Sequence, residues 1–113
     1  MRKNWLFTAA LVLAAASLAW AAPPGNAKEG KAVYSHSCQG CHGANGEGNP
    51  AIAKMMHVTM RALDSKEVQA KSDVQLSKDI TDGIGKMPAQ RTLSAKEVAD
   101  VVAYIRELGK SAK

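Results

Sequence analysis

The stretch "CQGCH", residues 38–42, contains both cysteines of this 113-residue chain, and a histidine directly follows the second. Three kinds of site use such a pentapeptide: half of a metal-binding knuckle, a redox-active dithiol, or a covalent anchor for haem. Each of them makes a different demand on the rest of the chain. The surrounding sequence therefore discriminates between the three.

The residues around the pentapeptide favour the haem anchor. A structural zinc site normally has four ligands, and His36 and His57 do not form a second pair with suitable spacing. A redox dithiol would need a βαβ context, and a disulfide between Cys38 and Cys41 would close a tiny loop and contribute little stability. In a haem site the two cysteines add to the two vinyl groups, and His42 becomes the proximal iron ligand. We therefore predict one covalently bound haem c.

The first 21 residues have the layout of a secretory signal. A basic start at residues 1–3 precedes an apolar run over residues 5–18, and small residues flank position 20. We predict cleavage after Ala21, which leaves residues 22–113 as one domain in the periplasm. The alternative is an uncleaved membrane anchor, because residues 5–22 are close to the minimum length that spans a bilayer.

The composition limits the function classes. Loss of Arg2 and Lys3 with the signal would lower the formal charge from +5 to +3, and acidic residues are interspersed among the basic ones. A nucleic-acid surface would concentrate Lys and Arg on one face, so we predict no nucleic-acid partner. The mature domain would keep only Tyr34 and Tyr104 as aromatic residues. A small chain without large side chains needs something else to fill its core, which also favours a cofactor.

Capping patterns and apolar periodicity predict an all-α domain. Asn26 precedes a predicted helix over residues 27–37, and Ser72 precedes one over residues 73–82. Ser94 begins a third, whose apolar stripe runs to Leu108 and which we expect to end at Gly109. Residues 43–50 are predicted to form a loop, a short helical turn is expected near residues 65–70, and residues 52–63 show no clean period.

The sixth ligand of the iron has several candidates: Met55, Met56, Met60, Met87, His36 and His57. Most methionines only fill cores, and His36 lies in the same helical turns as Cys38. Met87 is favoured because it follows a helix stop and because Pro88 fixes the backbone after it. His57 is the alternative.

At this point the sequence resembles the class I cytochromes c over nearly all of the mature domain. The resemblance rests on residues in the order of that family: Gly30, Tyr34, Cys38, Cys41, His42, Met87, Pro88, Val101 and Tyr104. It implies that the N- and C-terminal helices cross near Gly30 and Tyr104 around one haem ligated by His42 and Met87. The short separation of these two ligands is similar to that in small bacterial members.

Two departures from the family pattern lead to further expectations. The mature domain has no tryptophan to bind a haem propionate, so Arg61 or Arg91 is expected to do so. The loop before Pro50 differs in length from the family pattern, and the carbonyl of Pro50 is the candidate acceptor for the ring N–H of His42.

The resemblance implies a monomeric one-electron carrier rather than an enzyme. It would meet redox protein partners at an exposed haem edge near Lys86 and Arg91, whose charges steer acidic partners. One alternative is an electron-transfer subunit of a larger oxidoreductase. Another is a ligand-binding or peroxidatic haem protein, which would require a labile Met87.

Overall fold

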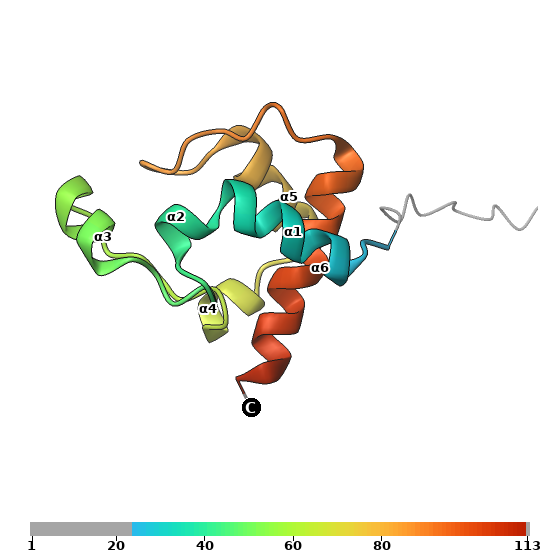
Figure 1. Cartoon of the computed structure of the whole chain (residues 1–113), viewed down its shortest axis with the longest axis horizontal. Coiled ribbons are helices and arrows are strands. Elements are labelled where there is room, and N and C mark those ends of the chain that lie inside the picture. The colour runs from blue at the N-terminus through green and yellow to red at the C-terminus, as the bar shows by residue number, and fades with distance from the viewer. Residues whose placement is uncertain (1–23, 113) are drawn as a thin grey trace, which may run out of the picture.

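The computed structural model describes residues 24–112, and the predicted signal, residues 1–21, lies outside them. Within these residues the chain forms helices and no named strand, as expected for an all-α domain (Figure 1). No helix in residues 24–112 is both long enough and apolar enough to cross a membrane. The helices are α1 (Ala27–Ser37), α2 (Gln39–His42), α3 (Pro50–Met56), α4 (Lys66–Gln69), α5 (Asp73–Asp82) and α6 (Ala95–Ser111).

The first and last long helices, α1 and α6, cross in direct backbone contact. Gly30 of α1 is buried, and a Cβ placed there would lie 1.9 Å from the carbonyl oxygen of Asp100. Only glycine leaves room for so close an approach. The expected crossing is confirmed, but Gly30 faces Asp100 and not Tyr104. Tyr104 packs instead on Tyr34, with 5.1 Å between the ring centroids.

Polar contacts strengthen this crossing. The carboxylate of Asp100 is buried, and it accepts hydrogen bonds from the backbone N–H of Asn26 and from Lys96 Nζ, both at 2.8 Å. Lys96 also pairs with Glu29 of α1. The hydrogen bond from Asn26, followed by that from Lys96, holds the pKa of Asp100 below its usual range. Asp100 is therefore charged at neutral pH and ties the start of α1 to α6.

The core lies between α5 and α6. Its buried residues are Leu76 and Ile80 of α5 and Val98, Val101, Val102 and Ile105 of α6. Capping boxes at Ser72 and Ser94 begin these two helices, as the sequence predicts. Arg106 of α6 donates to Asp73 Oδ1 at 2.9 Å and to the carbonyl of Gln69 at 3.0 Å. α6 therefore contributes most of the core residues and also binds the segment that leads into α5.

Helix boundaries differ from the expectations at three places. The short α2 was not predicted, and α3 begins at Pro50 inside the expected loop. The prediction that Gly109 ends the last helix is wrong, because α6 continues to Ser111. A Cβ at Gly109 would lie 2.5 Å from Cδ of Gln69. Gly109 thus makes room for the Gln69 side chain, which donates to the carbonyls of Leu63 and Ile105.

The crossing predicts the effect of adding one methyl group. Gly30→Ala should destabilise the haem-loaded protein by about 1 to 3 kcal/mol, because two helix backbones must separate. Gly40→Ala is the matched control, since a Cβ at Gly40 of α2 meets nothing within 4 Å. Urea unfolding followed by circular dichroism measures both. Equal midpoints for the two variants would contradict the close crossing.

Candidate functional site

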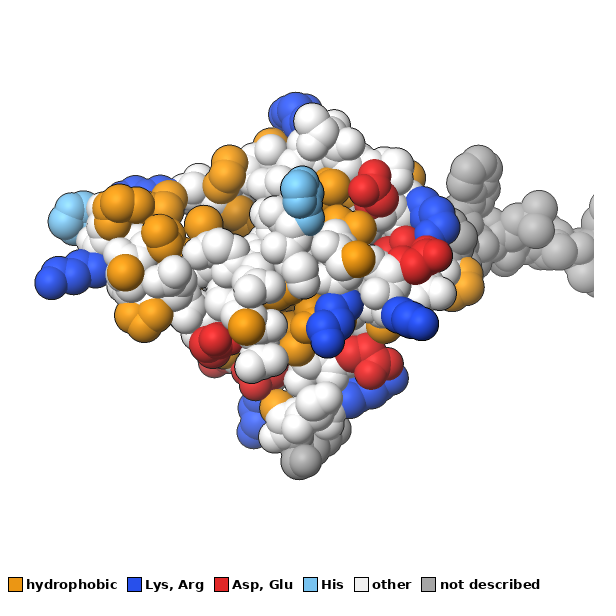
Figure 2. Space-filling model, viewed as in Figure 1, with side chains coloured by type: hydrophobic (Ala, Val, Ile, Leu, Met, Phe, Trp, Pro, Cys, Tyr) orange, Lys and Arg blue, Asp and Glu red, His pale blue; other side chains and the backbone are white. Residues whose placement is uncertain are grey.

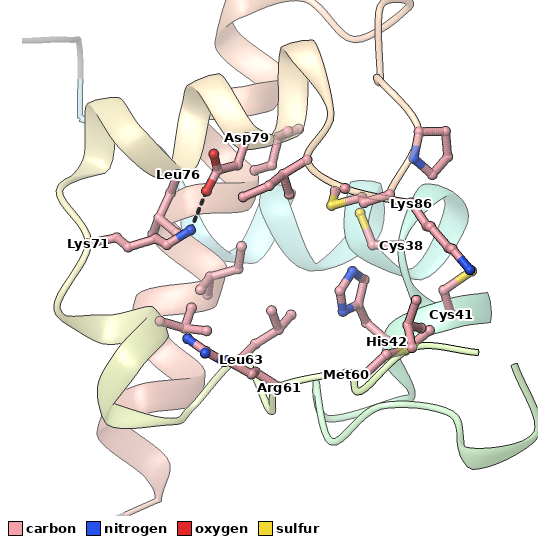
Figure 3. A pocket seen from close by; sticks show the side chains of 18 of the residues that line it. Cys38, Cys41, His42, Met60, Arg61, Leu63, Lys71, Leu76, Asp79 and Lys86 are labelled. Atoms are coloured by element: carbon pink, nitrogen blue, oxygen red, sulfur yellow. Dashed lines mark hydrogen bonds and ion pairs between the residues drawn. The ribbon is translucent and has the colours of Figure 1, made fainter. Parts of the chain in front are cut away.

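A cavity of about 390 Å³ lies beside α2 and opens between α3 and the loop that follows α5. A volume of this size is typical of ligand and cofactor sites. Figure 3 shows side chains from segments far apart in the sequence, from Cys38 to Lys86, around it. The residues that line it include Tyr34, Cys38, Cys41, His42, Met56, Val58, Met60, Arg61, Leu63, Val68, Lys71, Leu76, Asp79, Ile80, Ile84, Lys86, Met87, Pro88, Val101 and Ile105.

The single turn of α2 presents the pentapeptide to this cavity. The N–H of His42 donates to the carbonyl of Cys38 at 3.0 Å, which closes the turn. The N–H groups of Gly48 and Asn49 then donate to the carbonyls of His42 and Cys41, at 2.7 and 2.9 Å. Both thiols are free and line the cavity, and the imidazole of His42 projects into it (Figure 3). The structure thus brings together the three residues that the sequence singled out.

The environment of His42 suits a metal ligand. Burial lowers the pKa of its imidazole, so the ring is neutral and keeps a lone pair at neutral pH. Its Nδ1 is buried and has no hydrogen-bond partner in the structure. The expected bond to the carbonyl of Pro50 is therefore not made, because Pro50 begins α3. An orphaned nitrogen of this kind costs about 1 to 3 kcal/mol unless a ligand or a partner compensates for it.

The Cys38 thiol does not have the properties of a reactive redox thiol. Burial, followed by the nearby Cys41, raises the pKa of Cys38 to about 11. Reactive dithiols need a lowered pKa, because the thiolate is the nucleophile. Within residues 24–112, no group of three or more His, Cys, Asp and Glu side chains has a metal-binding arrangement. The raised pKa of Cys38 therefore disfavours a redox-active dithiol.

Met87 reaches the cavity on a tight turn after α5. Met87 and Ile84 exchange backbone hydrogen bonds of 2.9 and 3.2 Å. Gly83 has a φ of +79°, and a Cβ there would lie 2.7 Å from the carbonyl oxygen of Met87. The glycine is needed both for its dihedral angle and for space. Met87 is half-buried and lines the cavity.

The other candidates for a sixth ligand are placed differently. Met55 is 68% exposed, and it does not line the cavity; nor do His36 and His57, which are both exposed. Met56 and Met60 do line it. The Sδ atom of Met60, however, lies 4.0 Å from a Cβ built on Gly48, next to the His42 backbone. Met60 therefore packs against the loop that contains Gly48, whereas Met87 and Met56 line the cavity away from that loop.

One wall of the cavity carries charge. Lys71 Nζ and Asp79 Oδ2 form an ion pair of 2.7 Å, and Arg61 and Glu67 line the same cavity (Figure 3). Of the two arginines expected near a haem propionate, Arg61 lines the cavity and Arg91 does not. Lys71 was missed by the sequence analysis. Its position before the Ser72 cap was visible in the sequence, but its orientation depends on how α5 packs.

Tyr34 connects the helix crossing to the pentapeptide. Its buried hydroxyl donates to the carbonyl of Gly43 at 2.6 Å, directly after His42. Burial raises the pKa of Tyr34, so the hydroxyl stays protonated and remains a donor. The sequence analysis identified Tyr34 as a packing aromatic and missed this hydrogen bond. The bond fixes the backbone that carries the His42 imidazole.

Removal of this hydroxyl should therefore weaken the haem-loaded protein. We expect Tyr34→Phe to lower the free energy of unfolding by about 1 to 2 kcal/mol, because a part-buried carbonyl loses its donor. Tyr104→Phe is the control, since within residues 24–112 no hydrogen bond involves the Tyr104 hydroxyl and the ring packing is kept. Urea titrations compare the two variants. If both variants lost the same free energy of unfolding, the effect would come from ring packing and not from the hydrogen bond.

The residues of the cavity fit a haem. The lining is mainly apolar and suits a porphyrin, the guanidinium of Arg61 suits its carboxylates, and the orphaned imidazole of His42 suits its iron. Two thiols at the edge of the same cavity provide the means of covalent attachment.

Comparison with known proteins agrees with this geometry. The family model for cytochrome c matches residues 27–109, which include every helix described above except the last residues of α6. No curated protein matches the sequence closely enough to be named as a relative. The chain therefore belongs to the cytochrome c family, whose members hold haem c covalently, one in a single domain such as this, and use it in electron transfer.

Proposed function

We propose that the protein is a periplasmic one-electron carrier. Cys38 and Cys41 form thioether bonds to its haem, and His42 and Met87 are the two axial ligands. The observation that carries the proposal is that one apolar cavity contains both thiols, the neutral imidazole with its orphaned nitrogen and a thioether on a defined turn. The periplasmic location rests on the predicted signal at residues 1–21.

Each residue has a separate task in this proposal. The cysteines prevent loss of the cofactor, and His42 stays neutral because its surroundings are dry. Haem bound here supplies a one-electron couple, and an imidazole with a thioether gives it a raised potential. Arg61 and Lys71 compensate the charge of the haem carboxylates. Because both axial positions are filled by protein, no position remains for a substrate, which favours a carrier over a catalyst.

The segments around the mouth of the cavity favour an acidic partner. No Asp or Glu occurs in residues 49–63 or 83–96, which contain Lys54, Arg61, Lys86 and Arg91. Figure 2 shows hydrophobic side chains gathered over α3, with Lys or Arg and His beside them. Exposed Met55 and Ile84 belong to the same two segments. A basic rim with small apolar patches suits weak, fast contact with an acidic redox protein.

The covalent linkage predicts the result of an intact-mass measurement. The purified protein should have the mass of residues 22–113 plus one haem, and the haem should stay with the chain after acid–acetone extraction. Replacing Cys38 and Cys41 together by alanine should release the haem into the organic phase. Colour that leaves the wild-type chain on extraction would contradict the attachment. A mass that includes residues 1–21 would contradict the cleavage alone.

Axial ligation by Met87 predicts a spectroscopic change. Met87→Ala should abolish the long-wavelength charge-transfer band of the oxidised protein and should allow carbon monoxide to bind the reduced protein. Met56→Leu and Met60→Leu are the controls, which should keep the band and cost under about 1.5 kcal/mol each as volume-conserving changes. A band that survives in Met87→Ala and disappears in Met56→Leu would move the ligand to α3. Carbon monoxide binding by the wild type would favour a ligand-binding protein.

The basic rim predicts a salt-dependent reaction with anions. Oxidation of the reduced protein by ferricyanide should slow as salt is added, because a screened rim attracts the anion less. Lys54→Glu on α3 should slow the reaction at low salt more than Lys110→Glu, which changes the last turn of α6. Stopped-flow spectroscopy measures the rates. Equal effects of the two substitutions would mean that only net charge matters.

A further inference from the structure

One lysine joins the two methionine-bearing segments at the mouth of the cavity. Nζ of Lys86 donates to the backbone carbonyl of Met56 at 2.6 Å, across 30 positions of sequence. Lys86 precedes Met87 on the turn after α5, whereas Met56 is the last residue of α3. Both residues line the cavity. In residues 24–112 this is the only hydrogen bond between the turn and α3.

The carbonyl of Met56 has no backbone donor among the described residues. It belongs to the last turn of α3, where helical carbonyls have no partner within the helix. The N–H groups of His57 and Val58 donate to the carbonyls of Lys54 and Ala53, and neither reaches Met56. The end of a helix carries partial negative charge, which an ammonium group stabilises. Lys86 therefore satisfies an acceptor that the described backbone leaves unpaired.

Apart from the packing of Met87 against the core, the two segments have few attachments near the mouth of the cavity. In Figure 1, α3 stands away from the crossing of α1 and α6. Its segment is held at the base, where Asn49 donates to Cys41 and Leu63 donates to Gly46. The turn that carries Met87 is built on Gly83 and Gly85, and its neighbour Ile84 is 50% exposed. The contact made by Lys86 thus links the turn that carries Met87 to the C-terminal end of α3.

We propose that Lys86 is a positioning residue, a latch that holds the turn over the cavity and sets how readily Met87 leaves the iron. The inference rests on the proposed role of Met87 as axial ligand. An external ligand competes for the iron only in molecules whose turn has moved away. Its apparent affinity is therefore proportional to the fraction of open molecules. Loss of the Lys86 contact increases that fraction without removing any iron ligand.

Imidazole titration of the oxidised, haem-loaded protein tests the latch. Lys86→Ala should bind imidazole about tenfold more tightly than the wild type, a change of about 1.4 kcal/mol at 25 °C. Lys86→Arg keeps a cationic donor and should stay close to the wild type. Lys54→Ala removes an equal charge from α3 and serves as the control, since Lys54 is exposed and has no such contact. Loss of the long-wavelength band measures displacement of Met87.

The outcomes separate the latch from the axial assignment. A tighter affinity confined to Lys86→Ala, with an unchanged band before imidazole is added, supports the latch. Equal affinities in all variants, or an equal gain in Lys54→Ala, overturn it while the band in the wild type still supports Met87. A thermal unfolding midpoint that falls in Lys86→Ala with no change in imidazole affinity reduces Lys86 to a structural role. A wild-type protein without the band overturns the axial assignment and the latch with it.

Discussion

The backbone contact between α1 and α6 at Gly30 is the constraint on which the rest of the structure depends. It allows two helices from opposite ends of the chain to approach until the carbonyl of Asp100 occupies the place of a side chain. The buried Asp100 carboxylate then holds the start of α1 through Asn26 and Lys96. A pair of helices at this distance forms a rigid frame even though few large side chains are present.

The frame extends to the cavity through Tyr34, one turn after Gly30 on α1. Its ring packs on Tyr104 of α6, and its hydroxyl holds the carbonyl that follows His42. The imidazole therefore enters the cavity from a backbone that both helices position. Because burial lowers the pKa of His42 and raises that of Cys38, the ring is neutral and the Cys38 thiol is not acidic. The same burial thus favours iron ligation and disfavours thiol redox chemistry.

The opposite side of the cavity is built with less regular structure. Met87 lies on a turn that depends on Gly83, and Lys86 connects that turn to the end of α3. In the proposed carrier, Met87 would have to stay bound to the iron in both oxidation states, so attachment of this turn bears on the proposed function. The charged wall with Lys71 and Asp79 belongs to the better-packed part, because Arg106 of α6 holds the preceding backbone.

Local patterns in the sequence determined the three longest helices, α1, α5 and α6, and indicated the chemistry of the pentapeptide. Caps at Asn26, Ser72 and Ser94 act within four residues, so the starts of α1, α5 and α6 were predictable. The end of α6 and the partner of Gly30 were decided by contacts between distant segments. Gly109, for example, has the sequence of a helix stop and instead accommodates Gln69. Only the tertiary structure decides such pairings, because they depend on where packing places a backbone atom and not on the identity of neighbouring residues.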